Sequence, residues 1–577
     1  MSRRFDRTVF RRALDAFGPA FDGQRGKAGV AVGSTLTSTL LDLARPWPAA
    51  LVIDRILTST TPADRTDLML ILAAAVATGM ISLVVGQLNF IAAVKAAEVG
   101  RTATTRVRKM LFEHLNRLAL PFHSSSKTGD LLVRLTGDVA LIRDLMFTSW
   151  LSLLDFTLQI VGLVVIMVLL DPPVILVLIA PFVYMWIQGR RSAGELRKAV
   201  RLQRKNQGAS AAMAAESLAQ IRVIKAYGAE NLAVDTFDSS SIREEGEGFK
   251  AARIAAGIER RMEIVGGVGS GLVLLVAALR TVSGAITVGD LVVLVSYGKS
   301  LFKPLRKIST EVTRLAKASA VTERILEVLD VEPEDHMAGV DASRFGGEIS
   351  FHKVTFGYKN GRRVLEEADL FIPSGWLVAL VGGNGQGKST SLSLVLRLFE
   401  PESGVLTIDG RPIGEFRLDS YRKRMAYVPQ DLRLFSGSIA DNIRFGRPEA
   451  SDEEIRYAIT QAHFDQVVDR LEDGIDTQLA EGGSTLSGGE ARRLMLARAA
   501  VRNADVLLLD EPFAGLDPAA RPAVARSIRG ISDGRTTLVV AHGDLEDLEP
   551  DMIVELKDGK LRPVMVKRAA HGLADPA

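Results

Sequence analysis

The chain has 577 residues, of which 47% are hydrophobic and 24% are charged, and its mean hydropathy is +0.17. Its 71 Lys and Arg are nearly balanced by 68 Asp and Glu, so the net charge of +3 gives no reason to expect a nucleic-acid partner. Cysteine is absent, which excludes disulfides, thiolate metal sites, iron–sulfur clusters and cysteine nucleophiles.

Residues 1–25 have the pattern of an amphipathic helix. Apolar residues, Phe5, Phe10 and Phe17 among them, recur at near-helical spacing, and arginines fill the positions between them. The segment lacks an uninterrupted apolar core, so it is not a secretory signal. We interpret it as an interfacial helix on an anionic membrane face. The alternative is a soluble surface helix.

Six apolar stretches follow within residues 26–330. They cover residues 30–56, 67–94, 146–170, 173–189, 262–282 and 287–303. Each is near the roughly 20 residues that a helix needs to cross the hydrocarbon of a bilayer. The first is the weakest, because Asp42, Arg45, Pro46 and Pro48 interrupt it. A buried soluble helix is the alternative for any one stretch, but six of them in one half of a chain predict a membrane domain.

The distribution of basic residues predicts the orientation of this domain. Lys and Arg are dense in residues 1–27, 95–145 and 190–261, whereas the short connections between the other stretches carry one arginine, Arg65. Basic segments beside membrane helices stay in the cytoplasm. We therefore expect both ends of the six-span unit in the cytoplasm. The two long basic segments keep a helical periodicity, which predicts helices that extend beyond the membrane.

Residues 331–346 are predicted to be a linker, and residues 347–577 a soluble domain. The linker is acidic, contains proline and glycine, and has no periodicity. After it, strand-like and helix-like segments alternate, which is typical of an α/β domain.

A glycine-rich loop connects a buried strand to a helix in this domain. The apolar run 376–381 leads into the pattern G-x-x-x-x-G-K-[ST], and a helical pattern follows. Backbone N–H groups of such a loop, together with the helix N-terminus, bind phosphates. We expect Lys388 to contact the β- and γ-phosphates of a nucleotide and Ser389 to ligate Mg²⁺. The predicted nucleotide-binding residues here are Gly382, Gly383, Asn384, Gly385, Gln386, Gly387, Lys388, Ser389 and Thr390.

Two acidic residues follow a second apolar strand. Residues 506–509 lead into Asp510 and Glu511, and in a parallel sheet the carboxyl end of this strand lies beside the glycine-rich loop. Asp510 is therefore predicted to hold Mg²⁺, and Glu511 to polarise the attacking water. The predicted fold is an all-α membrane domain of six helices joined to an α/β P-loop nucleotide-binding domain.

Further motifs, in order along the chain, resemble those of ABC transporters. Residues 486–490, LSGGE, resemble the LSGGQ signature of that family, with Glu490 in place of glutamine. The resemblance covers nearly the whole chain, which is similar to an exporter-type half-transporter. By the same resemblance, the chain has an adenine-stacking residue, a glutamine that touches Mg²⁺ and the membrane-domain interface, a D-loop aspartate and a switch histidine at the γ-phosphate, namely Tyr358, Gln430, Asp517 and His542.

The resemblance implies a dimeric ATP hydrolase coupled to transport, with ATP and Mg²⁺ as cofactors. Gln430 and His542 then join Glu511 as catalytic residues. Two ATP molecules are expected between two ATPase domains, where one chain binds the γ-phosphate of the ATP held by the other through Ser487, Gly488 and Gly489. The departures at Glu490 and Gly515 remove no group that hydrolysis needs, which favours a homodimer and leaves a heterodimer possible.

The function expected from these features is an ATP-driven exporter or lipid flippase that works by alternating access. The expected location is the plasma membrane, in bacteria the inner membrane, with both termini in the cytoplasm. An importer on the same fold and an ATP-gated regulator or channel are the alternatives. Glu511 disfavours the regulator, because gating needs little turnover. The substrate stays open between a small molecule, a lipid and a peptide.

Four polar residues inside the predicted spans are candidates for a substrate cavity. Asp42 and Arg45 are three residues apart, and Asp155 and Gln159 are four apart, so each pair is expected to share a helix face. Such groups are costly in a membrane unless they face a wet cavity or each other. They are therefore either a lining that binds a polar substrate group or structural pairs, Asp42–Arg45 or Arg45–Asp155.

Overall fold

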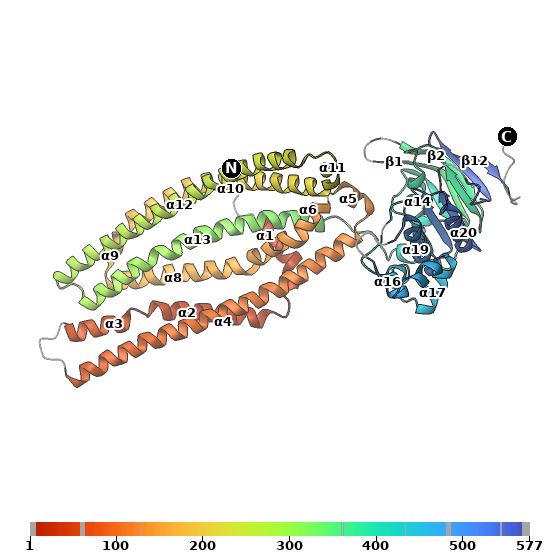
Figure 1. Cartoon of the computed structure of the whole chain (residues 1–577). Helices are drawn as coiled ribbons and strands as arrows, with labels where there is room; N and C mark the ends of the chain where they lie inside the picture. Colours follow the sequence, from red (N-terminus) through yellow and green to blue (C-terminus); the bar gives the residue numbers. More distant parts are fainter. Residues whose placement is uncertain are drawn as a thin grey trace. The chain divides into compact units, whose positions relative to one another are not determined.

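The computed structural model describes residues 7–57, 64–126, 128–358, 361, 363–432, 434–479, 486–542 and 545–567. The chain divides into two compact units, which Figure 1 shows coloured by sequence. The first unit contains Met1–Asn116 and Thr128–Val331, and the second contains Arg117–Lys127 and Glu332–Ala577.

The first unit is helical throughout its described residues apart from short turns. Its α-helices are α1 Arg7–Phe17, α2 Arg25–Leu43, α3 Trp47–Val52, α4 Arg65–Arg117, α6 Thr128–Val133, α7 Val139–Arg143, α8 Ser149–Leu170, α9 Pro172–Leu176, α10 Ile179–Ala219, α11 Ile221–Ala226, α12 Glu230–Val282 and α13 Val288–Leu329. A 3-10 turn covers Gly18–Phe21, and π-helical turns cover Ile53–Leu57, Arg134–Asp138 and Asp144–Thr148. Helix α5, Leu120–Ser125, groups with the second unit.

Three of these helices are long and apolar enough to cross a membrane by themselves: α4, α8 and α12. The other three predicted spans are also helical. Residues 30–56 fall on α2, α3 and the π-helical turn after them, residues 173–189 on α9 and α10, and residues 287–303 on α13. Helices α4, α10 and α12 run for 53, 41 and 53 residues, more than a bilayer needs, as the long basic segments predict.

A break between α2 and α3 interrupts the first predicted span. Pro46 and Pro48 have no N–H group to continue the helical ladder, and the Trp47 N–H bonds to the carbonyl of Ala44. The carbonyl of Leu43 instead accepts the hydroxyl proton of Tyr297 on α13, and the indole N–H of Trp47 donates to the same hydroxyl at 2.9 Å. Tyr297 is 2% exposed, so one buried hydroxyl satisfies two polar groups that the break leaves free.

Replacing this hydroxyl is expected to destabilise the membrane domain. Tyr297→Phe keeps the ring but leaves the Leu43 carbonyl and the Trp47 N–H without their partner. Each unsatisfied buried group costs about 1–3 kcal/mol. A fall in melting temperature of the detergent-solubilised protein should follow, whereas Tyr184→Phe, at an exposed position on α10, should change it little. Equal melting temperatures for the two variants would contradict this role of Tyr297.

The N-terminal helix α1 has a protein partner over part of its surface. Helix α1 packs against α13. Ala13 and Phe17 of α1 are fully buried, and Arg12 of α1 forms an ion pair of 2.5 Å with Asp330. Leu14, by contrast, is 44% exposed. The interfacial placement of residues 1–25 stays a prediction: Phe5 lies outside the described residues, as does the side chain of Phe10.

The second unit is built on two main sheets. The larger has the order β12-β11-β3-β10-β9-β6, in which β12 alone is antiparallel, and the other is antiparallel with the order β2-β1-β4-β5. The strands are β1 Ile349–Gly357, β2 Arg363–Ile372, β3 Leu377–Val381, β4 Ser403–Ile408, β5 Arg411–Pro412, β6 Met425–Val428, β7 Gly437–Ser438, β8 Gln478–Leu479, β9 Val506–Asp510, β10 Thr536–Val540, β11 Met552–Lys557 and β12 Lys560–Val566. The helices are α14 Lys388–Val395, α15 Leu418–Lys423, α16 Ile439–Arg444, α17 Asp452–Gln461, α18 Asp465–Arg470, α19 Gly488–Val501 and α20 Arg521–Ser532.

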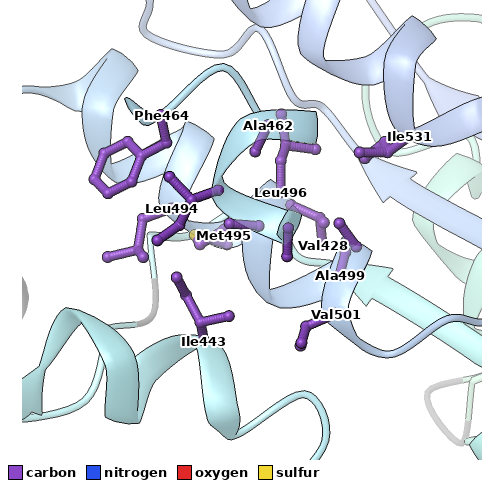
Figure 2. Close-up of a cluster of buried hydrophobic side chains, with 14 of the residues drawn as sticks. Val428, Ile443, Ala462, Phe464, Leu494, Met495, Leu496, Ala499, Val501 and Ile531 are labelled. Atoms are coloured by element: carbon purple, nitrogen blue, oxygen red, sulfur yellow. The ribbon is translucent and has the colours of Figure 1, made fainter. Parts of the chain in front are cut away.

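Two apolar clusters fix the positions of these elements. One lies between the two sheets and includes Phe351, Val378 and Leu508. The other surrounds α19, where Leu494 and Leu496 pack with residues of β6, α16 and α20, as Figure 2 shows. Helix α19 is thereby held rigidly against the parallel sheet, and its N-terminus is the LSGGE segment.

Candidate nucleotide-binding site

The loop between β3 and α14 has a backbone that only glycine can form at two positions. Gly382 and Gly387 have φ values of 149° and 111°. A Cβ atom would lie 2.5 Å from the carbonyl oxygen of Leu556 at Gly382, and 2.0 Å from a methyl carbon of Val364 at Gly387. The N–H of Gly383 donates to the side chain of Gln386 at 2.8 Å. The sequence GGNGQGKS therefore folds into a closed loop at the start of a helix, a geometry that binds phosphate.

Lys388 lies across this loop. Its ammonium donates to the carbonyls of Gly382 and Gly383, both at 2.9 Å, and the residue is 5% exposed. Burial lowers the pKa of the Lys388 ammonium, and the charges of Glu511 and Asp510 oppose that shift. The ammonium is therefore held at the place where the loop would receive the β- and γ-phosphates, and a bound phosphate would favour its charged form.

Ser389 and Asp510 lie in contact beside the loop. The Ser389 hydroxyl donates to Asp510 at 2.8 Å, and the Tyr427 hydroxyl also bonds to this carboxyl. Asp510 is 4% exposed, and burial raises its pKa. Burial also raises the pKa of Tyr427 to about 12. A hydroxyl and a carboxylate oxygen in contact, at the edge of a phosphate loop, fit the oxygen ligands that Mg²⁺ takes.

Glu511 lies between Gln430 and His542. One carboxylate oxygen accepts the Gln430 amide proton at 2.7 Å, and the other lies 3.1 Å from His542 Nε2. The three residues follow three neighbouring strands, β6, β9 and β10, whose parallel pairing aligns their carboxyl ends. Glu511 itself has a φ of 47°, and its N–H is fixed by the Val540 carbonyl at 3.0 Å. This left-handed turn aims the carboxylate along the sheet edge that carries Asp510.

Tyr358, the residue expected to stack on adenine, lies directly after β1 and contacts α14. Its hydroxyl bonds to Thr390 at 3.0 Å, and its ring packs edge-on against Phe356 and Phe399 at centroid distances of 5.2 and 5.5 Å. The residue as a whole remains 40% exposed, as stacking on a base requires. The D-loop residue Asp517 makes a local contact instead. Its carboxylate accepts the N–H of Ala519 at 3.3 Å and forms a turn.

The LSGGE segment is separate from the phosphate loop. Ser487 caps α19, and Gly488 and Gly489 form its first turn, with their N–H groups at the open end of the helix. In the part of the chain that the structure describes, no hydrogen bond or ion pair joins Leu486–Glu490 to the phosphate loop. This end of α19 therefore presents open N–H groups away from the phosphate loop of the same chain.

Sequence reasoning missed Arg492, which connects three parts of the site. It is 2% exposed and donates to the carbonyls of Pro429 and Gln430 at 3.2 and 2.9 Å, and to that of Ala514 at 3.4 Å. The signal for it was a charged residue on the face of α19 that is otherwise apolar. The sequence analysis also missed Tyr427, which comes three residues before Gln430 and whose hydroxyl bonds to Asp510.

The four polar residues of the membrane domain form two separate clusters. Asp155 accepts hydrogen bonds from Thr39 at 2.6 Å and Gln159 at 3.0 Å. Arg45 lies 3.6 Å from Asp42 and donates to Ser82 at 3.2 Å, so the alternative pair Arg45–Asp155 is not formed. Helix α2 ends at Leu43, so Arg45 lies in the turn after the helix and not on the helix face that the spacing predicted.

Comparison with known proteins identifies both units. Residues 29–305 match the family described as ABC transporter transmembrane region, and residues 365–514 match the ABC transporter family. A Bacillus subtilis ABC transporter ATP-binding protein, YwjA, is 30% identical over 525 residues, which are 90% of each chain. An ATP-dependent lipid A-core flippase of Chromobacterium violaceum is 30% identical over 83% of this chain and 82% of its own.

A solved structure shows the same fold. A bacterial Atm1-family ABC exporter with ATP bound has a TM-score of 0.80 and 24% sequence identity, and the match covers 96% of this chain and 95% of that chain. Taken with the relatives, the importer alternative is not favoured. The chain therefore belongs to the ABC transporter family and is an ATP hydrolase that drives transport across a membrane, with an exporter-type helical domain fused to its ATP-binding cassette.

Proposed function

We propose that the chain works as a homodimer that moves an amphiphilic, lipid-like molecule across the bacterial inner membrane, with both termini in the cytoplasm. The proposal of a homodimer is supported by the complete set of hydrolytic groups in one chain, so that two identical chains would form two complete sites. The set consists of Lys388, the Ser389–Asp510 contact, and Glu511 between Gln430 and His542. The lipid-like substrate is supported by relatives that are lipid A-core flippases.

Each residue has a defined task in this site. Lys388 and the N–H groups of the loop would bind the β- and γ-phosphates, and Ser389 and Asp510 would hold Mg²⁺ with the help of Gln430. The ion supplies positive charge that offsets the charge of the phosphates. Glu511 accepts the proton of the attacking water, and His542 and Gln430 hold its carboxylate in place.

The second chain supplies the other face of the site. The open N–H groups at Gly488 and Gly489 and the hydroxyl of Ser487 would bind the γ-phosphate on the partner's loop. Loss of that phosphate removes the anion that joins the two chains, so hydrolysis becomes an opening motion.

A covalently linked dimer tests the shared site. Ser487→Arg in one half should disable one ATP site only, and about half of the wild-type ATPase rate or less should remain, depending on how strongly the two sites are coupled. Binding of labelled ATP should fall at the site built on the other half's Lys388. Full ATPase activity from an isolated monomer in a nanodisc would contradict the shared site.

Arg45 is proposed to bind an anionic group of the substrate. Its side chain is 56% exposed, its ion pair with Asp42 spans 3.6 Å, and its guanidinium has more donors than Asp42 and Ser82 take up. Arg45→Ala should then abolish stimulation of the ATPase by an anionic phospholipid in proteoliposomes, while basal ATPase activity and melting temperature stay unchanged.

The structural alternative gives the opposite pattern. If Arg45 serves only to pair with Asp42, Arg45→Ala should lower the melting temperature, and Arg45→Ala with Asp42→Ala should restore part of it. A destabilised Arg45→Ala protein that responds normally to the anionic lipid would exclude the binding role. Comparison with a zwitterionic phospholipid separates charge recognition from a general effect of lipid.

A further inference from the structure

The LSGGE segment carries a carboxylate where the family signature has a neutral glutamine. The Glu490 carboxylate accepts the backbone N–H of Ser487 at 2.9 Å, and the Glu490 N–H donates to the Ser487 hydroxyl at 3.3 Å. This reciprocal pair is a capping box, which fixes the first turn of α19. A glutamine could make the same two hydrogen bonds, so the added negative charge is not needed for the cap.

The charge works against phosphate binding at the same helix end. The N-terminus of an α-helix carries the equivalent of about half a positive charge, which is what attracts an anion. A full negative charge in the first turn reverses the sign of the local potential. The carboxyl is ionised at neutral pH: burial acts to raise the pKa of Glu490, but its hydrogen bonds to Ser487 and Arg470 lower it below its usual value.

Arg470 supplies the compensating charge. It is the last residue of α18, and its guanidinium lies 2.5 Å from the second carboxylate oxygen of Glu490. The Glu490 side chain is only 13% exposed, whereas that of Arg470 is 63% exposed. The neighbouring Arg493 donates a guanidinium N–H to the carbonyl of His463 at 2.7 Å, and it acts on Glu490 through its charge. Arg470 is thus the cation that is hydrogen-bonded to the carboxylate.

We propose that Arg470 is a positioning residue for ATP hydrolysis: it neutralises Glu490, so that the start of α19 can bind the γ-phosphate of the ATP on a second copy of the chain. Through the same contact it holds the carboxylate in the capping box, with the Ser487 hydroxyl and the N–H groups of Gly488 and Gly489 in place. The inference rests on the proposed shared site.

A charge-removal series tests this role. Arg470→Gln should raise the ATP concentration for half-maximal hydrolysis about tenfold, because a carboxylate that has lost its ion-pair partner then faces a polyanion. Glu490→Gln, which removes the charge, should not weaken ATP use. The double variant Arg470→Gln with Glu490→Gln should recover the wild-type ATP dependence, and Arg470→Lys should stay close to wild type.

Rescue of the ATP dependence by the second substitution, with the same melting temperature for all variants of the series, is the decisive readout, since a purely structural ion pair would show its loss and repair in the melting temperature. The matched control is Arg529→Gln, which removes an exposed arginine of α20 from an ion pair of 3.4 Å with Glu549. It should leave the ATP dependence unchanged.

Two results would overturn the inference: an Arg470→Gln protein with wild-type ATP dependence, or a double variant as impaired as Arg470→Gln. A melting curve of each variant separates misfolding from loss of ATP use. A separate measurement tests the proposed shared site itself. If that proposal is wrong, the wild-type protein would hydrolyse ATP as a monomer.

Discussion

Glu511→Gln is expected to reduce steady-state ATP hydrolysis by about 10²–10⁴-fold, the usual contribution of a positioned general base. An amide cannot accept the proton of the attacking water at neutral pH, yet it has the same shape and can keep hydrogen bonds with Gln430 and His542. ATP binding should therefore survive, and the dimer should accumulate in its closed, ATP-bound form. Phosphate release measures the rate, and cross-linking between two chains measures the closed dimer.

Glu415→Gln is the matched control for Glu511→Gln. Its carboxylate is 55% exposed and lies 3.5 Å from Arg411, in the second unit but outside the site. It should hydrolyse ATP at the wild-type rate. A Glu511→Gln protein that releases phosphate within about twofold of wild type would remove Glu511 from the role of base.

Lys388→Met is expected to lose ATP affinity and hydrolysis together. Methionine fills the space of the buried side chain but carries no charge, so the loop loses the cation that contacts the β- and γ-phosphates. Removal of one such preorganised group costs about 10²–10³-fold in rate. Because the ammonium donates to Gly382 and Gly383, the substitution also removes two hydrogen bonds that close the loop.

Calorimetric titration with ATP checks this prediction. Lys560→Met, at a lysine that is 40% exposed and lies 3.8 Å from Glu367, is the control and should bind ATP normally. The two variants at the site then differ in kind: Glu511→Gln should bind and not hydrolyse, and Lys388→Met should do neither. Unchanged ATP binding by Lys388→Met would contradict the assignment of the phosphate loop.

The sequence by itself was sufficient for the phosphate loop, the acids after β9 and the helical nature of the six spans. These features depend on neighbours in the chain: apolar runs, glycines at fixed spacing, and acids at the end of a strand. The meeting of Ser389 with Asp510 also followed, because strands of a parallel sheet end at the same edge. Gln430 and His542 came from the resemblance alone, and the structure brings both to Glu511.

The tertiary structure decided which distant side chains became partners. Tyr297 reaches the carbonyl of Leu43 across 254 positions, and Thr39 reaches Asp155 across 116. Arg470 meets Glu490 because the end of α18 and the start of α19 come together. No periodicity encodes such pairs, since they depend on how whole helices pack. For the same reason the sequence left Asp155 as a possible partner of Arg45, and only the packing of α2 and α8 gave that carboxylate to Thr39 instead.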